Sequence, residues 1–203
     1  MPVIISGAVS GATTLQATDA VTATITLPSA TDTLVGKATT DTLTNKTLTL
    51  PVVGTTIGVG AATPSASGAG ITFPATQSAS TNANTLDDYE EGTWTPTVAS
   101  TVGSLGAVTT NLGTYTKIGK LVTLQIYHNI NNGTGSGTIS ITNIPFAPDT
   151  TLRYVAGTGL NLSSVAQNSM YLDTATSTIG CQKYDGTFPA AFCSYTISYW
   201  ATA

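Results

Sequence analysis

Charged side chains are scarce in this sequence. Asp, Glu, Lys and Arg make up 8% of the 203 residues, against about 25% in an ordinary soluble domain. With six Lys and Arg and a net charge of -4, the chain lacks the clustered positive charge that displaces counterions from a nucleic acid. We therefore expect no nucleic-acid partner.

Long apolar runs are also missing. A membrane-spanning helix needs about 18 or more consecutive apolar residues, and the sequence holds no such run, so we expect no membrane insertion. The opening "MPVIISGAVSGA" has neither the basic flank nor the long apolar stretch of a signal peptide. These features predict folding in a cytoplasm, where Cys181 and Cys193 stay reduced.

No stretch of about a dozen residues carries apolar positions at helical spacing. Thr, Ser, Gly and Ala dominate instead, and Thr is β-branched and well suited to a pleated surface. Residues 22–28, 47–53 and 120–130 alternate between apolar and polar with period two. The sequence therefore predicts an all-β protein.

Aromatic residues are almost absent from the first part of the chain. Phe73 is the single aromatic residue before Tyr89, and large aromatic side chains dominate core burial. The segment 60–84 is small, polar and Pro-containing, as linkers are. We predict a Thr-rich region at 1–84 that ends in this linker, and a domain with its own core at 85–203.

A short repeat occupies part of the first region. "TDTL" occurs at 31–34 and again at 40–43, each time followed three residues later by Lys. One Leu per copy is too little for a core, so we predict that three chains wind about a common axis where Leu34 and Leu43 meet their own copies. The alternative is a surface loop whose repetition arose by chance, because so short a repeat does not by itself define an architecture.

Several segments resemble those of a known family. "SGATTLQATDAVTATITLP", "TDTLVGKATTDTLTNKTLTLP", "LDDYEEGTWTPTV" and "GTYTKIGKLVTLQI…GTISITNIPFAP" are similar to segments of tail fibres and related structural proteins of tailed bacteriophages, over most of residues 6–148. The resemblance implies a homotrimer with an extended, intertwined N-terminal region that binds other virion proteins. It also implies a C-terminal antiparallel β-sandwich of jelly-roll type.

The expected function is host attachment by a short tail fibre. Such a protein is assembled in the host cytoplasm, resides in the virion and binds a surface glycan or protein without chemistry. One alternative is a structural trimer that decorates the capsid or belongs to the tail assembly, and another is a polysaccharide depolymerase. Hydrolase, metalloprotease and phosphate-loop motifs are absent from the sequence, so we expect no enzyme and no cofactor.

The acidic cluster Asp87, Asp88, Glu90 and Glu91 allows three interpretations. Paired carboxylates about 5 to 9.5 Å apart serve glycoside hydrolysis, and calcium takes six to eight oxygen ligands. These four acids are adjacent in sequence and lack a calcium-loop pattern. We therefore favour a solvated or subunit-facing turn at the entrance of the domain.

The alternating segment 120–130 is the clearest predicted strand. Val122, Leu124, Ile126, His128 and Ile130 share one face, and Leu121, Thr123, Gln125 and Tyr127 share the other. "TISITNI" at 138–144 follows a Gly-rich loop and reads as its hairpin partner. His128, the sole histidine, is predicted to be a hydrogen-bonded core residue, with a metal centre on a threefold axis as the alternative. No metal site is expected.

The segment 181–193 carries the candidate receptor loop. Asp185-Gly186 is a strong turn signal, and a hairpin centred on Thr187 would place the two cysteines opposite each other. We expect half-buried reduced thiols there, with a disulfide as the alternative. The turn presents Tyr184, Asp185 and Phe188, the aromatic and acidic side chains that sugar-binding loops use. These three residues are the predicted receptor contacts, and the alternative is that they serve turn geometry, as such residues do at exposed hairpin tips.

Overall fold

The computed structural model describes residues 3–6, 12–15, 43, 47–77, 80–82, 84–131, 134–183 and 191–202. The chain forms two units, Met1–Pro51 and Val52–Ala203. Every regular element within the described residues is a β-strand, so the predicted all-β class is confirmed for this part of the chain. The domain boundary near residue 84 stays a prediction.

The first unit contributes one small antiparallel pair. Strand β1 (Val3–Ser6) pairs with β2 (Ala12–Leu15). Of the two predicted axial residues, Leu43 is 48% exposed and Leu34 lies outside the described residues, so the intertwined trimer stays a prediction. The predicted strand at 47–53 is wrong, since this segment forms no strand and Leu50 has a positive φ of 52°.

The second unit begins with a short parallel pair. Strand β3 (Thr56–Gly58) pairs with β4 (Gly70–Thr72). At the middle of this pair, Ile57 lies beside Ile71, and both side chains are about half exposed. The segment therefore has β geometry without an enclosed core of its own.

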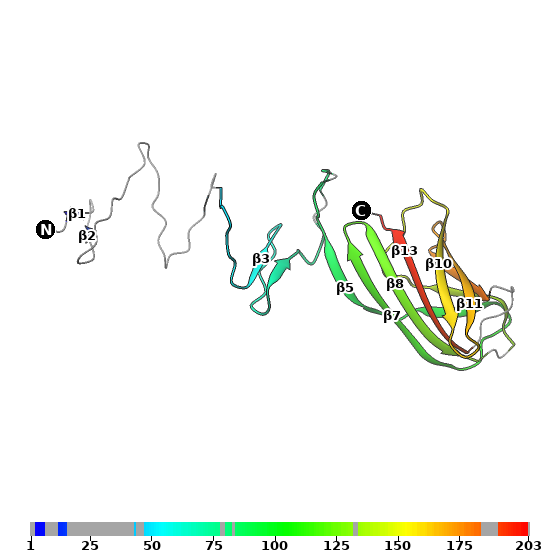
Figure 1. Ribbon diagram of the computed structural model, residues 1–203. Coiled ribbons are helices and arrows are strands. Elements are labelled where there is room, and N and C mark those ends of the chain that lie inside the picture. The colour runs from blue at the N-terminus through cyan, green and yellow to red at the C-terminus, as the bar shows by residue number, and fades with distance from the viewer. Residues whose placement is uncertain are drawn as a thin grey trace. The chain divides into compact units, whose positions relative to one another are not determined.

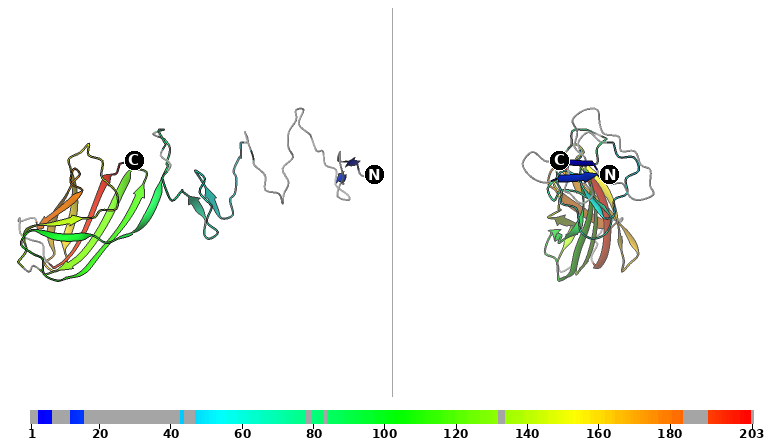
Figure 2. Two further views of the ribbon diagram at one scale, coloured as in Figure 1. Left: turned by 180° about the vertical axis from the view of Figure 1, so that it is seen from behind. Right: turned by 90° about the vertical axis from the view of Figure 1, so that its left-hand side faces the viewer.

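Nine antiparallel strands then form one large sheet (Figure 1). In chain order they are β5 (Tyr89–Trp94), β6 (Thr97–Val102), β7 (Val108–Ile118), β8 (Leu121–Ile130), β9 (Ser136–Thr142), β10 (Tyr154–Asn161), β11 (Ala166–Asp173), β12 (Thr178–Lys183) and β13 (Ala191–Trp200). Their order across the sheet is β5-β7-β8-β13-β10-β11-β12-β9-β6. The sheet curls, so it has an inner and an outer face (Figures 1 and 2).

The two edges of this sheet are consecutive in the chain. Strand β5 at one edge continues into β6 at the other through Thr95-Pro96. The carbonyl of Thr95 accepts a hydrogen bond from the amide of Asn143 at 3.2 Å, and that of Pro96 accepts one from the amide of Asn111. Proline suits such a place because it cannot donate to a ladder.

The core lies on the inner face. Val122, Leu124, Ile126, His128 and Ile130 of β8 are buried, as their alternation predicts. They pack with inward-facing residues of the other strands, among them Ile139, Ile141, Leu172, Ile179, Ile197 and Tyr199. Because strands from both ends of the sheet supply this cluster, curling lets a single sheet enclose a core.

Glycines and aromatic residues form cross-strand pairs in this sheet. Gly92 pairs with Tyr115 and Gly113 with Trp94, so each ring lies over its partner glycine. A Cβ added to Gly92 would lie 2.7 Å from the Tyr115 hydroxyl oxygen. The pair Gly159–Tyr195 follows the same pattern. A ring that covers a glycine restores the burial that the missing side chain would have supplied.

Two predicted pairings are wrong. Strand β9, predicted as the hairpin partner of β8, pairs with β6 and β12 instead. Strands β12 and β13 are likewise not neighbours, since β10 and β11 lie between them. Cys181 and Cys193 are therefore not cross-strand partners, and both are fully buried thiols rather than half-buried ones.

Candidate functional site: the outer face of the sheet

The outer face of β5, β7, β8 and β13 is a regular grid. We call each line of cross-strand partners a rung. The second rung joins Glu91, Thr116, Thr123 and Ser198, and the third joins Thr93, Thr114, Gln125 and Thr196. Thr123 and Ser198 share a hydrogen bond of 2.9 Å between their hydroxyl oxygens. Together these two rungs form a band of hydroxyl and amide groups with one carboxylate.

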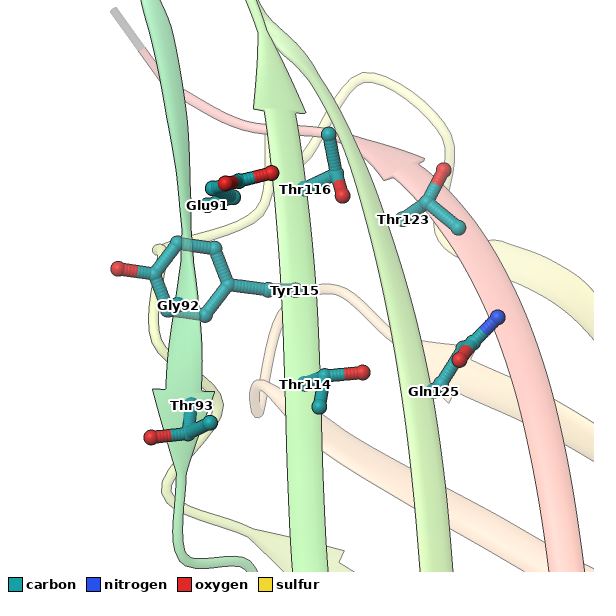
Figure 3. Close-up of a pocket in the computed structure, with 8 residues that line it drawn as sticks. All are labelled: Glu91, Gly92, Thr93, Thr114, Tyr115, Thr116, Thr123 and Gln125. Carbon is teal, nitrogen blue, oxygen red and sulfur yellow. The ribbon is translucent and has the colours of Figure 1, made fainter. Parts of the chain in front are cut away.

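A shallow hollow lies on this polar band (Figure 3). It has a volume of about 420 Å³. Its lining comes from three adjacent strands, with Glu91, Gly92 and Thr93 on β5, Thr114, Tyr115 and Thr116 on β7, and Thr123 and Gln125 on β8. The hollow thus offers hydrogen-bond donors and acceptors at closely spaced positions on a rigid sheet.

Apolar side chains flank the polar band on both sides. The first rung joins Tyr89, Ile118, Leu121 and Trp200, each between 40% and 59% exposed. Beyond the third rung, the exposed apolar residues are Leu112, Leu160 and Phe192, and the Phe192 ring lies 6.4 Å from that of Tyr127. Among the described residues on the outer face of these four strands, Glu91 is the one charged side chain.

The acidic cluster does not converge on a ligand. Strand alternation turns Glu91 to the outer face, where it accepts a hydrogen bond of 3.0 Å from the Tyr89 hydroxyl. This bond raises the pKa of Tyr89. Asp87 accepts a 2.7 Å hydrogen bond from the backbone amide of Ser80, which lowers the pKa of that carboxyl. Asp88 is buried on the other side.

Asp88 forms a buried ion pair with Lys117. The Lys117 ammonium also donates to Gln77 at 3.4 Å and lies 5.5 Å from the centre of the Phe146 ring. The backbone carbonyl of Asp88 accepts from the amide of Gly119 at 2.9 Å. This part of the acidic cluster therefore anchors the entrance of the sheet to the β7–β8 hairpin, a role that the favoured solvated turn did not predict.

His128 lies in the core, as predicted. Its Nε2 is 3.1 Å from the hydroxyl oxygen of Tyr195, and the side chain is fully buried. Burial lowers the pKa of His128 to about 4, so the ring is neutral at pH 7. Burial also raises the pKa of the Cys181 thiol far above its usual range, which leaves it protonated and unreactive. These groups act as packing residues.

The three predicted receptor contacts stay a prediction. Tyr184, Asp185 and Phe188 lie outside the described residues, in the connection from β12 to β13. Within the described part of the chain, no group of three or more His, Cys, Asp or Glu side chains is arranged to hold a metal ion. No described helix is long and apolar enough to cross a membrane.

The hollow on the outer face was not predicted from the sequence. Alternation alone indicates that Thr123 and Gln125 share a face, but it does not say which strands lie beside them. The register that aligns Thr93, Thr114, Gln125 and Thr196 joins segments up to about a hundred residues apart. Comparison with known proteins gives no match to a family model, a curated protein or a solved structure.

Proposed function

We propose that the protein is a structural component of a bacteriophage virion, most specifically a short homotrimeric tail fibre that attaches to the host surface by non-catalytic binding. The sequence resemblance over most of residues 6–148 motivates the family. In this proposal the region 1–84 binds other virion proteins, and the β domain, with the jelly-roll-like organisation predicted for it, faces the host.

The polar hollow is the observation that carries the binding role. Its lining of Thr hydroxyls, the Gln125 amide and the Glu91 carboxylate suits the hydroxyl groups of a surface glycan. Glu91 is the one acidic residue that lines it, whereas glycoside hydrolysis needs two carboxyl groups across the sugar. These features favour recognition over cleavage.

The segment between β12 and β13, which carries Tyr184, Asp185 and Phe188, is the second candidate contact. It connects β12 to β13, and strand β13 begins near Phe192, which is exposed beside Tyr127. Binding residues concentrate on loops held by a rigid scaffold, and aromatic residues are enriched among binding hot spots. A glycan or a protein receptor could use this segment, whereas the hydroxyl-lined hollow favours a glycan.

Labelling the virion tests the role. Antibodies raised against the purified protein, visualised on virions by electron microscopy, should mark fibres at the tail, and the purified protein should compete with virions for adsorption to host cells. Regular label over capsid faces without competition would instead support the capsid-decorating alternative. Release of new reducing ends from host polysaccharide would support the depolymerase.

Matched variants test the two candidate contacts. We expect Thr114→Val to weaken cell binding, because it removes a hydroxyl from the hollow at nearly constant shape. Thr158→Val should not, because Thr158 lies exposed on the same rung but outside the hollow. Changing Tyr184 and Phe188 together to Ala tests the loop, with thermal unfolding measured beside binding. Full cell binding by a variant of normal stability would rule out the corresponding candidate contact.

A further inference from the structure

The first rung is a continuous apolar strip at one end of the sheet, and we call it the entry rung because β5 enters the sheet there. Tyr89 is the first residue of β5, Trp200 is the last of β13, and Ile118 and Leu121 flank the β7–β8 turn. Their side chains lie side by side on the outer face through the strand register. The rung contains no charged residue.

The strip adjoins a second hollow. Trp200, 59% exposed, lines it together with Asp149, Thr151, Leu152 and Val155, and its volume is about 250 Å³. Leu152 is 61% exposed. Soluble monomers seldom expose contiguous apolar patches beyond a few hundred Å², and larger ones mark interaction sites. An exposed Trp beside an apolar hollow is also the arrangement from which interface hot spots are made.

The same chain supplies a suitable partner. Exposed apolar side chains also occur N-terminal to β5, at Val52, Val53, Ile57, Ile71 and, closest to the strand, Leu86. Any association between copies through that segment tethers their sheets by a few residues, since Leu86 and Tyr89 are three positions apart. Tethering raises the effective concentration of a second contact to the millimolar range. Association of the segments would therefore favour a second copy of this chain over other partners at the strip.

The lack of charged residues on the entry rung also supports a second copy of this chain as the partner. The cores of protein interfaces are depleted of charged residues and enriched in aromatic ones, as the entry rung is. Charged groups border the rung without belonging to it, since Glu91 on the next rung already accepts a hydrogen bond from Tyr89 and Asp149 lines the adjoining hollow with Trp200. A strongly charged partner would find no opposite charge on the rung, whereas a second copy would present the same uncharged apolar strip.

We propose that the entry rung is a contact between copies of this chain, with Leu121 and Trp200 at its centre. The inference rests on the proposed homotrimer and specifies which surface of the β domain its copies share. It divides the outer face into a self-association end at the entry rung and a polar band left open to ligand.

Site-directed crosslinking in the full chain tests the contact. A cysteine introduced as Leu121→Cys would lie in the contact, and Ser169→Cys would lie exposed on β11 of the same sheet as the matched control. The native thiols are buried and do not compete. With a short bismaleimide at low protein concentration, L121C should form covalent multiples of the chain at least tenfold more efficiently than S169C.

The oligomeric state of the parent, measured by light scattering, separates the possible failures. A parent oligomer in which L121C crosslinks no better than S169C would overturn the entry-rung contact and leave the homotrimer standing. A monomeric parent, or crosslinking of L121C to a different protein, would also overturn it. Efficient self-crosslinking by a protein that fails to compete for host cells would uphold the contact and count against the attachment function.

A second variant tests the proposal even if the introduced cysteine perturbs the sheet. Leu121→Thr combined with Trp200→Thr retains β-forming residues at exposed positions. We expect its circular dichroism to match the parent, and its dissociation on dilution to begin at a concentration at least tenfold higher. An unchanged dissociation profile would overturn the proposal.

Discussion

Residues 47–77 and the nine-stranded sheet use much the same small and β-branched residues, yet they bury them differently. In the first segment Leu50 is 90% exposed and Val52 is 95% exposed, whereas in the sheet Leu124 and Leu172 are fully buried. Both regions contain β-strands. The difference is therefore not one of strand propensity.

Aromatic residues and length explain the contrast. The sheet has strands of up to 11 residues and rings such as Tyr195 and Tyr199 that fill its interior. Strands β3 and β4 have three residues each, which is too few to enclose a core. A two-stranded element is marginal alone, and stability needs more strands or a partner surface. The described residues of the chain thus give the short segment little burial of its own.

The largest expected effect is at the junction of the two regions. Asp88→Asn would leave the Lys117 ammonium buried without its counter-charge, and we expect the free energy of unfolding to fall by about 3 to 5 kcal/mol. Arg153→Gln, which breaks the more exposed Arg153–Asp173 pair, should lower it far less, because solvent screens that pair. Urea unfolding measures both, and equal costs would contradict the assignment of a structural role to Asp88.

A pair of truncations tests the contrast directly. Leu172→Ala removes fully buried methyl groups and should lower the free energy of unfolding by about 2 to 5 kcal/mol. Ile57→Ala, at a half-exposed position, should change it by no more than about 0.5 kcal/mol within a single chain. Chemical denaturation gives both values. A large cost for Ile57→Ala would mean that another copy covers this side chain.

Acid should weaken the sheet through His128. Burial holds its pKa at about 4 in the folded protein, below the ordinary value of 6.5. The unfolded state therefore binds a proton first as the pH falls, and stability present above pH 6.5 is lost progressively down to pH 4. The loss approaches about 3 kcal/mol. Thermal unfolding of parent and His128→Gln across this range measures it, and identical pH profiles would refute the prediction.

Two glycines give the smallest expected effects, with opposite signs. Gly113→Ala would place a Cβ against the Trp94 ring, and overpacking of this kind typically costs about 1 to 3 kcal/mol. Gly54→Ala in the short segment meets no atom within 4 Å and should be neutral or raise stability by up to about 1 kcal/mol through the unfolded state. Melting temperatures of both variants check this. Destabilisation by Gly54→Ala would mean that another part of the chain or another copy contacts this position.

The sequence predicted which face of a strand is buried better than it predicted which strands pair. Alternation located the buried face of β8 correctly because the period of two is a local property of the strand. It did not predict that β9 pairs with β6 and β12, since nothing local in "TISITNI" selects among nine strands. The same limit explains why the pairing of the segments that carry Cys181 and Cys193 was wrong. Asp185-Gly186 indicates a turn, but it does not indicate that β10 and β11 lie between β12 and β13 in the sheet.

The candidate site was less predictable than the fold. The acidic cluster drew attention because charges are rare in this chain, yet its members separate once β5 alternates. The hollow depends on a register between strands that are distant in sequence, and the entry rung depends on which exposed side chains become neighbours. Trp200 illustrates the point, since its neighbour on the rung is Leu121, which lies about 80 residues earlier in the chain.

The central place of β13 has a consequence for synthesis. This strand is the last in chain order, yet it lies between β8 and β10 in the sheet. As the chain leaves the ribosome, β5, β7 and β8 can pair on one side, and β10, β11, β12, β9 and β6 on the other. The two halves have no ladder between them until Ala191–Trp200 emerges. The core therefore closes only after Ala191–Trp200 has been translated, and a ribosome stalled before this strand would hold two open half-sheets with apolar faces for chaperones to bind.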